Sequence, residues 1–233
     1  MSILDPLRRL KHRVLHSKDK RSYALDDLDL RLEPFLDFRN GTFVEAGAND
    51  GLKQTNTLYF EKNKGWSGLL IEAVPELVER CRQNRSNCIV EHAALVADDY
   101  PGDTVELRYC DLMSVVKGGL DSEEKELNHI KKGMQFLSEG DAPRTVTAPA
   151  RTLGDILDYH SVSDVDLLSL DVEGYEAQVL QGLDLPRQCP QYILVEVRDI
   201  NKIQKVVGSY YKHVATLSVR NDRRDVLFEL IRQ

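Results

Sequence analysis

Short apolar runs alternate with longer segments of mixed polarity along most of the chain. The runs have the length of single strands, and helix formers lie between them, with Pro75 in a first helical turn and Gly65 and Gly182 as stop signals. This alternation predicts an α/β fold with a doubly wound, mainly parallel sheet. The last two strands are joined by the polar turn RNDRRD, so they must run antiparallel. The predicted strands are 42–46, 68–71, 88–92, 165–170, 192–197, 213–217 and 226–231, and the predicted helices are 58–64, 75–85, 152–159, 176–181 and 203–211.

The alternation is interrupted between the third and fourth of these strands. Residues 103–109 fit a further strand, but residues 111–147 have charges, paired glycines and little apolar periodicity. Such a segment often forms a lid or a substrate-binding insertion, and a surface excursion without function is the alternative. We therefore divide the chain into a polar, partly helical extension at 1–40 and a domain at 41–233 that carries a variable insert, or lid, at 111–147.

A glycine-containing turn follows the first strand. The sequence FVEAGANDG ends an apolar run at Glu45 and then turns tightly. Ligands of such sheets bind beyond the carboxyl ends of the strands, and Gly47 and Gly51 would let the backbone approach a ligand closely. Glu72 ends the second strand 25 residues after Gly47, near the spacing at which a carboxylate binds a ribose. Together these features indicate a cofactor that contains a nucleoside.

The residue types in the turn favour one such cofactor. The dinucleotide fingerprint G-x-G-x-x-G is absent, and Glu45, Asn49 and Asp50 make the turn unfavourable for the phosphates that bind at helix N-termini. Acidic surroundings suit S-adenosylmethionine, which has a sulfonium and an ammonium group. A single acidic residue at a strand end is more typical of a solvated loop. The indication of this cofactor therefore comes from Glu45, Gly47, Gly51 and Glu72 occurring together in this order. Asn56 and Thr57 follow, where they would bind the methionine carboxylate or cap a helix.

Carboxylates also follow two central strands of the predicted sheet. Asp171 directly follows the fourth strand, Glu173 lies two residues on, and Glu196 lies near the end of the fifth. An alcohol acceptor is a poor nucleophile, so a general base or a metal ion would help its methylation. Asp171 is our preferred base, and the three carboxylates are ligands of the type that Mg²⁺ takes. The structural alternatives are a helix cap for Glu173 and, for Glu196, a buried ion pair with Arg198 or another cation.

Histidines are alternative bases. His92 ends the third strand, close to where adenine would lie, although an ordinary packed side chain is the simpler interpretation. His129 lies in the insert and would reach the acceptor if that segment closes as a lid. We rank neither above Asp171.

Several segments together resemble the FkbM family of S-adenosylmethionine-dependent methyltransferases: FVEAGANDG, NTLYFEKNKGWSGLLIEAVPE, AALV, RTLGDIL and LLSLDVEGYEAQVLQGLD. The resemblance covers about residues 40–200, and DVEGYE is its most specific part. It implies a class I methyltransferase (Rossmann-like) fold, with a seven-stranded sheet whose last strand is antiparallel. It also implies methyl transfer to oxygen, often on a hydroxyl of a sugar, glycan or natural product. The family's first motif begins with Asp where this chain has Glu45, which is a conservative change.

The residue pattern and the resemblance give one candidate site. The candidate catalytic residues are Asp171, Glu173 and Glu196, which are also the candidate ligands of Mg²⁺. The candidate residues for S-adenosylmethionine are Glu45, Gly47, Asn49, Asp50, Gly51, Asn56, Thr57, Glu72, Ala73, His92, Ala93 and Asp171.

Composition and charge limit the kinds of binding partner that the chain is expected to have. The chain of 233 residues has a net charge of −7, so its surface as a whole does not attract nucleic acid. Basic residues between Arg8 and Arg21 are the exception, either a solvated helix face or a docking site for an anionic partner or membrane surface. No apolar run is long enough for a transmembrane segment, and a secretory signal is lacking, so we expect a cytoplasmic protein. We expect a small-molecule or glycan acceptor, and a homo-oligomer is compatible with the sequence. The four cysteines have no metal-binding spacing, and we interpret them as reduced thiols.

Two other functions stay open. A nucleotide-cofactor oxidoreductase is disfavoured because the three-glycine fingerprint is missing. A non-catalytic, methyltransferase-like binding module is disfavoured, because a site that has lost its catalytic activity need not retain Glu45, Gly47, Gly51, Glu72 and Asp171 together.

Overall fold

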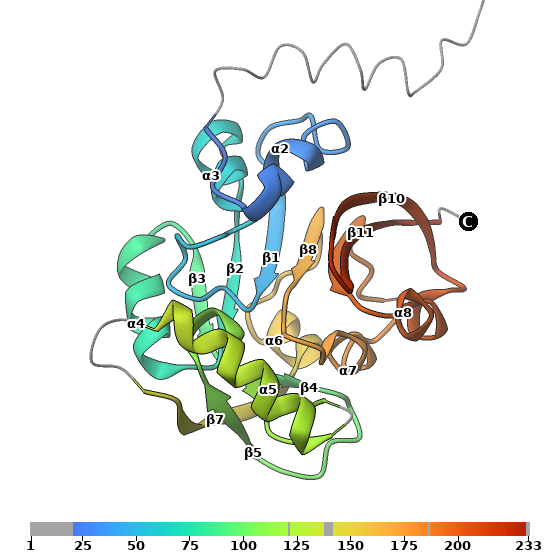
Figure 1. Cartoon of the computed structure of the whole chain (residues 1–233). Coiled ribbons are helices and arrows are strands. Elements are labelled where there is room, and N and C mark those ends of the chain that lie inside the picture. Colours follow the sequence, from blue (N-terminus) through green and yellow to red (C-terminus); the bar gives the residue numbers. More distant parts are fainter. Residues whose placement is uncertain (1–20, 121, 138–141, 186, 232–233) are drawn as a thin grey trace, which may run out of the picture.

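The computed structural model describes residues 21–120, 122–137, 142–185 and 187–231, and a seven-stranded sheet forms its centre (Figure 1). The strand order is β10-β11-β9-β8-β1-β2-β3, and β11 is antiparallel to both of its neighbours. The other pairs in this sheet are parallel, which confirms the predicted sheet with an antiparallel last strand. The strands are β1 (Thr42–Ala46), β2 (Ser67–Glu72), β3 (Ile89–His92), β8 (Leu167–Leu170), β9 (Tyr192–Val197), β10 (Tyr211–Arg220) and β11 (Arg223–Leu230).

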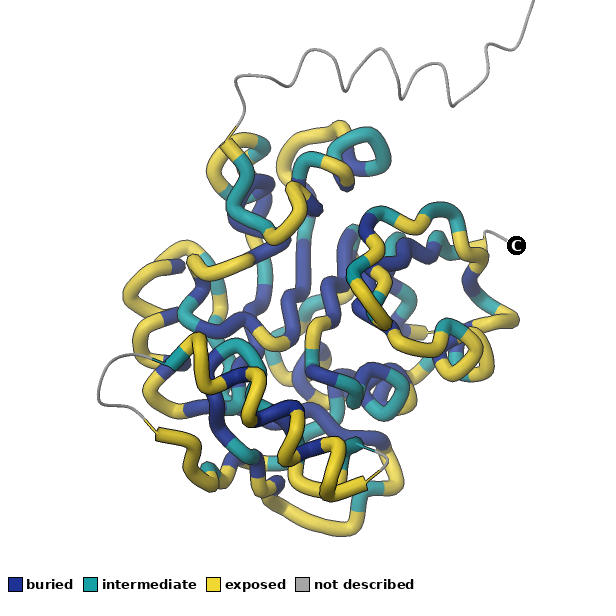
Figure 2. The backbone as a smooth tube through the Cα atoms, viewed as in Figure 1, coloured by how far each residue is buried: buried dark blue, intermediate teal, exposed yellow. Residues whose placement is uncertain are grey.

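Helices cover both faces of this sheet, as expected for strands that are apolar throughout. Val44 and Ala46 of β1 belong to the core cluster that includes α6, α7 and α8, whereas Phe43 belongs to the cluster on the other face, with α2, α3 and α4. Figure 2 shows the central strands as mostly buried and the surrounding helices as more exposed. The helices of the first face are α6 (Leu153–Tyr159), α7 (Glu176–Gln181) and α8 (Ile200–Val207), and those of the second are α2 (Leu28–Leu32), α3 (Leu58–Lys64) and α4 (Pro75–Asn84).

The largest boundary errors of the prediction lie near the C-terminus. The last helix begins at Ile200 rather than at residue 203, because the Asp199 side chain accepts a hydrogen bond from the Asn201 backbone N–H and caps the helix there. The predicted turn RNDRRD is shorter than expected, since β10 continues to Arg220 and β11 begins at Arg223. Two of its arginines lie in these strands and are ion-paired there: Arg220 with Glu196 and Asp225, and Arg223 with Glu196.

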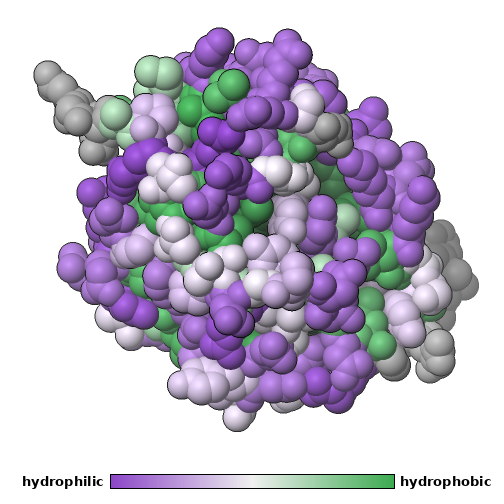
Figure 3. Space-filling view, turned by 90° about the horizontal axis from the view of Figure 1, so that it is seen from below, coloured by the Kyte–Doolittle hydropathy of each residue, from purple (hydrophilic) through white to green (hydrophobic). Residues whose placement is uncertain are grey.

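A second, four-stranded sheet was not predicted as a unit. Its order is β4-β7-β5-β6, and only the strand at 103–109 was expected. The insert also contains a helix, α5, although its sequence lacks clear apolar periodicity. From the side of this sheet, the surface is mostly hydrophilic, with hydrophobic areas in its recesses (Figure 3). The elements are β4 (Ala94–Val96), β5 (Thr104–Tyr109), β6 (Val115–Val116), α5 (Glu123–Gly133) and β7 (Arg144–Thr152), with short 3-10 helices η1 (Leu25–Asp27), η2 (Asp111–Met113) and η3 (Met134–Phe136).

Part of the N-terminal extension contributes to the core. Leu32 and Leu36 are fully buried against α3 and the large sheet. Of the basic cluster, only Arg21 lies within the described residues, where its guanidinium lies 5.6 Å from the ring centroid of Tyr23. The four cysteines are free thiols, as predicted. None of the helices in the described ranges has the length and apolarity that crossing a membrane requires.

Candidate active site

The strands β1, β2, β8 and β9 end at one cleft of about 1550 Å³, whose opposite wall comes from the second sheet and α5. Of the residues proposed from the sequence, most line this cleft, and four do not. The lining residues are Glu45, Gly47, Asn49, Asn56, Glu72, Ala73, Ala93, Asp171, Glu173 and Glu196, and the others are Asp50, Gly51, Thr57 and His92.

The two glycines of the first turn are required by protein contacts. Both have left-handed backbone conformations, with φ of +81° at Gly47 and +78° at Gly51. A Cβ atom on Gly47 would lie 2.0 Å from the carbonyl oxygen of Asp171, and one on Gly51 would lie 2.7 Å from the Cγ of Arg85. Both glycines therefore allow close packing of the turn, against the end of β8 and against Arg85 at the end of α4, and Gly47 in addition lines the cleft.

Glu45 holds the loop that follows the turn. Its carboxylate accepts hydrogen bonds from the hydroxyls of Thr55 (2.7 Å) and Thr57 (2.5 Å) and from the backbone N–H of Asn56 (2.8 Å). The buried guanidinium of Arg85 lies 4.0 Å away and donates to both threonine hydroxyls. Glu45 is therefore engaged by the protein, and it acts on the cleft mainly by fixing this loop.

Asn56 is the member of this loop that faces the cleft. Its Nδ2 donates to Ser169 Oγ at 3.1 Å, but its buried Oδ1 has no hydrogen-bond partner within the described part of the chain. A buried acceptor without a donor is costly. An ammonium group in the cleft would satisfy it, which fits the amino acid part of S-adenosylmethionine.

Glu72 is fixed at the end of β2. Its carboxylate accepts three backbone hydrogen bonds at 2.8–2.9 Å, from Asn49, Ala73 and Val74. Burial raises the pKa of Glu72, the three hydrogen bonds oppose this, and Asp111 contributes to the rise. These bonds leave acceptor capacity on the carboxylate for the hydroxyls of a ribose. His92 lies behind this site, where its ring contacts the Ala73 carbonyl oxygen at 3.0 Å.

The turn is linked to the insert by a residue that the sequence did not indicate. Asp111 lines the cleft and accepts from Asn49 Nδ2 at 3.2 Å and from Lys53 Nζ at 2.9 Å. Asp50 instead closes the turn, because it accepts from the backbone N–H groups of Leu52 and Lys53. A positive φ of 51° at Asp111 is consistent with a constrained site, but the sequence offers no signal for its position.

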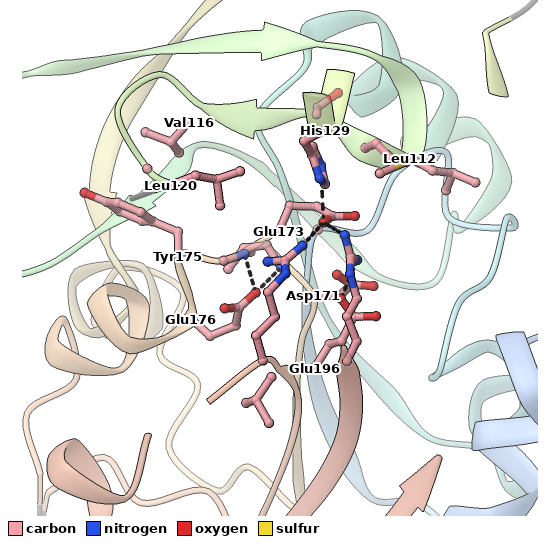
Figure 4. A pocket seen from close by; sticks show the side chains of 18 of the residues that line it. Leu112, Val116, Leu120, His129, Asp171, Glu173, Tyr175, Glu176 and Glu196 are labelled. Atoms are coloured by element: carbon pink, nitrogen blue, oxygen red, sulfur yellow. Dashed lines mark hydrogen bonds and ion pairs between the residues drawn. The ribbon is translucent and has the colours of Figure 1, made fainter. Parts of the chain in front are cut away.

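The three carboxylates predicted at the strand ends do converge. Glu196 pairs with Arg220 at 2.8 Å and with Arg223 at 2.5 Å, and Glu173 pairs with Arg223 at 2.8 Å. Figure 4 shows the side chains of Asp171, Glu173 and Glu196 close to one another in the cleft. Glu173 lines the cleft and has a positive φ of 56°.

These ion pairs argue against the predicted magnesium site. The described residues contain no group of three His, Cys, Asp or Glu side chains that would hold a metal ion. Two of the three proposed ligands are already neutralised by arginines, which repel a cation. The prediction failed because Arg220 and Arg223 come from the closing hairpin, far along the chain, and sequence spacing does not show their approach.

Asp171 differs from its two neighbours. No hydrogen bond or ion pair from a described residue reaches its carboxylate, which is open to the cleft. Its surroundings of protein atoms raise the pKa of Asp171 well above 3.8, and the nearby carboxylates of Glu196 and Glu173 raise it further. An unpartnered carboxylate with a raised pKa is suited to accept a proton.

The insert supplies the remaining wall of the cleft. Leu112, Val116 and Leu120 lie on this side, and Tyr175, which comes two residues after Glu173, also lines the cleft (Figure 4). His129 of α5 is also in the wall, with Nε2 3.4 Å from Glu173 Oε2. The sequence placed His129 near an acceptor only if the insert closes, and the described structure already has it beside Glu173.

The doubly wound seven-stranded sheet with an antiparallel last strand, and a cleft suited to a nucleoside at its carboxyl edge, define the class I methyltransferases. A family model described as "Methyltransferase FkbM domain" matches residues 45–226. The chain therefore belongs to the FkbM family, and it is an S-adenosylmethionine-dependent methyltransferase. This confirms the family predicted from the sequence.

Comparison with solved structures and curated proteins adds the following findings. The human methyltransferase 10 domain containing protein is 10% identical, with a TM-score of 0.49, and the alignment covers 100% of this chain and 99% of that chain. The TehB-like S-adenosylmethionine-dependent methyltransferase of Corynebacterium glutamicum is 11% identical, with a TM-score of 0.44 and coverage of 97% of both chains. An RNA methyltransferase of Salinibacter ruber in complex with S-adenosyl-L-homocysteine is 13% identical, with a TM-score of 0.43 and coverage of 88% of this chain and 91% of that chain. A search of curated proteins found no match.

Proposed function

We propose that this methyltransferase transfers the methyl group to oxygen, on a hydroxyl of a sugar, glycan or natural product. The observation that carries the proposal is Asp171, a carboxylate without a described partner at the floor of the cleft. An alcohol needs such a base, because its own pKa is high and its neutral oxygen is a weak nucleophile. The insert at 111–147 would enclose a small-molecule or glycan acceptor in this cleft. We also propose that the protein acts in the cytoplasm.

The cofactor would bind along the ends of β1 and β2. Glu72 would accept hydrogen bonds from the ribose hydroxyls, Asn56 Oδ1 would accept from the ammonium group, and Ala73 and Ala93 would leave space for the adenine. When bound there, S-adenosylmethionine supplies an electrophilic methyl group. The loop with Asn56 is already fixed by Glu45, so little ordering is needed on binding.

On the acceptor side of the cleft, some residues would position the acceptor and one would accept its proton. Asp171 would accept the hydroxyl proton, whereas Arg220 and Arg223 keep Glu196 ion-paired and away from this role. The cleft walls hold donor and acceptor close together, and such alignment is worth about 7–11 kcal/mol of the barrier in favourable cases.

Calorimetry tests the cofactor first. We expect S-adenosylmethionine and S-adenosylhomocysteine to bind with micromolar affinity or better and NAD not to bind. Tight binding of NAD alone would contradict a methyltransferase and favour the oxidoreductase. Acceptor hydroxyls are then screened by mass spectrometry for the gain of one methylene. Methylation of nitrogen or carbon in place of oxygen would overturn the proposal.

Glu72→Ala should weaken cofactor binding by about 1–3 kcal/mol, or roughly 5- to 150-fold in Kd, because the ribose loses its acceptor. Isothermal titration with S-adenosylmethionine measures this change. Glu72→Gln, which retains one acceptor oxygen, should give a smaller loss. The exposed Glu79 on α4 provides a matched control as Glu79→Ala. An unchanged Kd in Glu72→Ala, with the fold intact by circular dichroism, would remove Glu72 from the cofactor site.

A further inference from the structure

Arg198 lines the cleft with only distant partners. It directly follows β9, and a Cβ atom on Gly174 would lie 3.3 Å from its Nη1 and 2.8 Å from Leu120 Cδ2. The guanidinium therefore lies between the loop after β8 and the insert. Its carboxylate neighbours are Asp222, 3.4 Å from Nε, and Glu173, 4.0 Å from Nη2. No hydrogen bond joins the Arg198 side chain to another residue in the described ranges.

These two contacts leave the donors of Arg198 available. Glu173 already pairs with Arg223 at 2.8 Å, and the side chain of Asp222 is 74% exposed. An ion pair with so exposed a partner contributes little, because water competes for both charges. A guanidinium presents a planar fork of N–H donors, which matches the oxygens of a carboxylate or a phosphate. Arg198 therefore offers the cleft a binding group for an anion.

Basic side chains lie on the cleft walls at either side of this guanidinium. Lys125 and Lys132 line the cleft from α5, one turn before and one turn after His129. Lys202 and Lys205 line it from α8. Residues three or four positions apart lie on the same face of a helix, so each pair of lysines shares a face. Of the described residues of these two helices, no Asp or Glu lines the cleft. This end of the cleft is therefore basic, although the chain has a net charge of −7.

We propose that the acceptor carries an anionic group, a carboxylate or a phosphate, in addition to the hydroxyl that is methylated. Arg198 binds this group from the sheet side of the cleft, and Lys132 binds it from the insert. A sugar acid and a sugar phosphate are acceptors of this kind. The inference rests on the proposed function, because it concerns the acceptor of the same cleft.

The carboxylate of the cofactor is a different group. The amino acid part of S-adenosylmethionine is assigned to Asn56, whose side chain donates to Ser169 of β8. Arg198 follows β9, on the side of β8 away from β1 and β2, where the cofactor would lie. Filling the cofactor site with S-adenosylhomocysteine before the test removes this source of an anion.

Calorimetry on the full chain, saturated with S-adenosylhomocysteine, tests the proposal with sugars that differ only at C6: glucose, glucuronate and glucose 6-phosphate. We expect at least one anionic sugar to bind about 10- to 150-fold more tightly than glucose, as for hydrogen bonds to a charged group. Tighter binding of glucuronate would identify a carboxylate, and tighter binding of glucose 6-phosphate would identify a phosphate. Equal affinity for the three sugars, or no binding of either anionic sugar, would overturn the proposal.

Two variants test the residues. Arg198→Met and Lys132→Met should each remove most of the preference for the anionic sugar and leave the affinities for glucose and S-adenosylhomocysteine unchanged. Damage to the fold would instead weaken the binding of all these ligands. Arg198→Lys, which retains the charge without the planar fork, should restore part of the preference. An anionic preference that persists in full in Arg198→Met would contradict the proposal.

The control and the order of measurements separate this inference from the function on which it rests. Lys212, an exposed cation on β10 outside the cleft, gives the matched control as Lys212→Met, which should retain the wild-type preference. Binding of S-adenosylhomocysteine together with O-methylation of neutral sugars only would leave the proposed function in place and remove the anionic acceptor. Failure to bind S-adenosylhomocysteine would instead remove the proposed function itself.

Discussion

Asp171→Asn should lower the rate of methyl transfer by about 10²–10⁴-fold, because the acceptor hydroxyl loses its base. The amide is nearly the same size as the carboxylate, so the close contact of Gly47 with the Asp171 backbone is retained. Cofactor affinity should therefore be unchanged. Single-turnover kinetics on an acceptor identified by mass spectrometry measure the rate, and calorimetry measures the Kd for S-adenosylmethionine.

The pH dependence of the same reaction gives a second measure of this role. The pKa of Asp171 is raised, so activity should fall as the pH drops through a value above 3.8, where the base becomes protonated. This acidic limb should be absent from the residual activity of Asp171→Asn. Asp222, an exposed acid at the rim of the cleft, gives a control as Asp222→Asn with a wild-type rate and profile. A wild-type rate in Asp171→Asn would remove this residue from the mechanism.

The sequence was most informative where burial is continuous. Strands such as Tyr192–Val197 are apolar on both faces, so their extent and order of appearance could be predicted from apolar runs alone. The carboxylates at their ends were found for a related reason, since parallel strands bring their carboxyl ends to one edge. Asp171 and Glu72 therefore fell into the same cleft although they are 99 residues apart.

The sequence was uninformative where a residue's role depends on a distant partner. β7 consists largely of threonine, alanine and arginine and is stabilised by pairing with β5, so it has no apolar run. The magnesium prediction counted carboxylates but not the arginines that the closing hairpin brings to them. The local pattern around His129 is that of an exposed helix, and only the packing of α5 over the cleft places it beside Glu173.

Arg85 is the clearest example of a residue whose role depends on partners that are distant in the sequence. As a charged residue at the end of α4, it would be expected in solvent, yet its side chain is 0% exposed. It donates to Gly51 O at 3.1 Å and pairs with Glu61, as well as bonding the two threonines next to Glu45. Arg85 thus connects both ends of the loop that presents Asn56 to the cleft. Because it does not line the cleft itself, its effect on cofactor binding would be indirect.

Arg85→Met should lower the free energy of unfolding by about 3–5 kcal/mol, because it leaves the carboxylates of Glu45 and Glu61 without their buried cation. Urea denaturation followed by circular dichroism measures this loss. The same variant, below its unfolding transition, should also bind S-adenosylmethionine more weakly, since Asn56 is no longer held in place. Arg82→Met, on the exposed face of the same helix, is the matched control and should change stability by less than about 1 kcal/mol. A stability for Arg85→Met equal to that of the control would show that the buried guanidinium does not organise this loop.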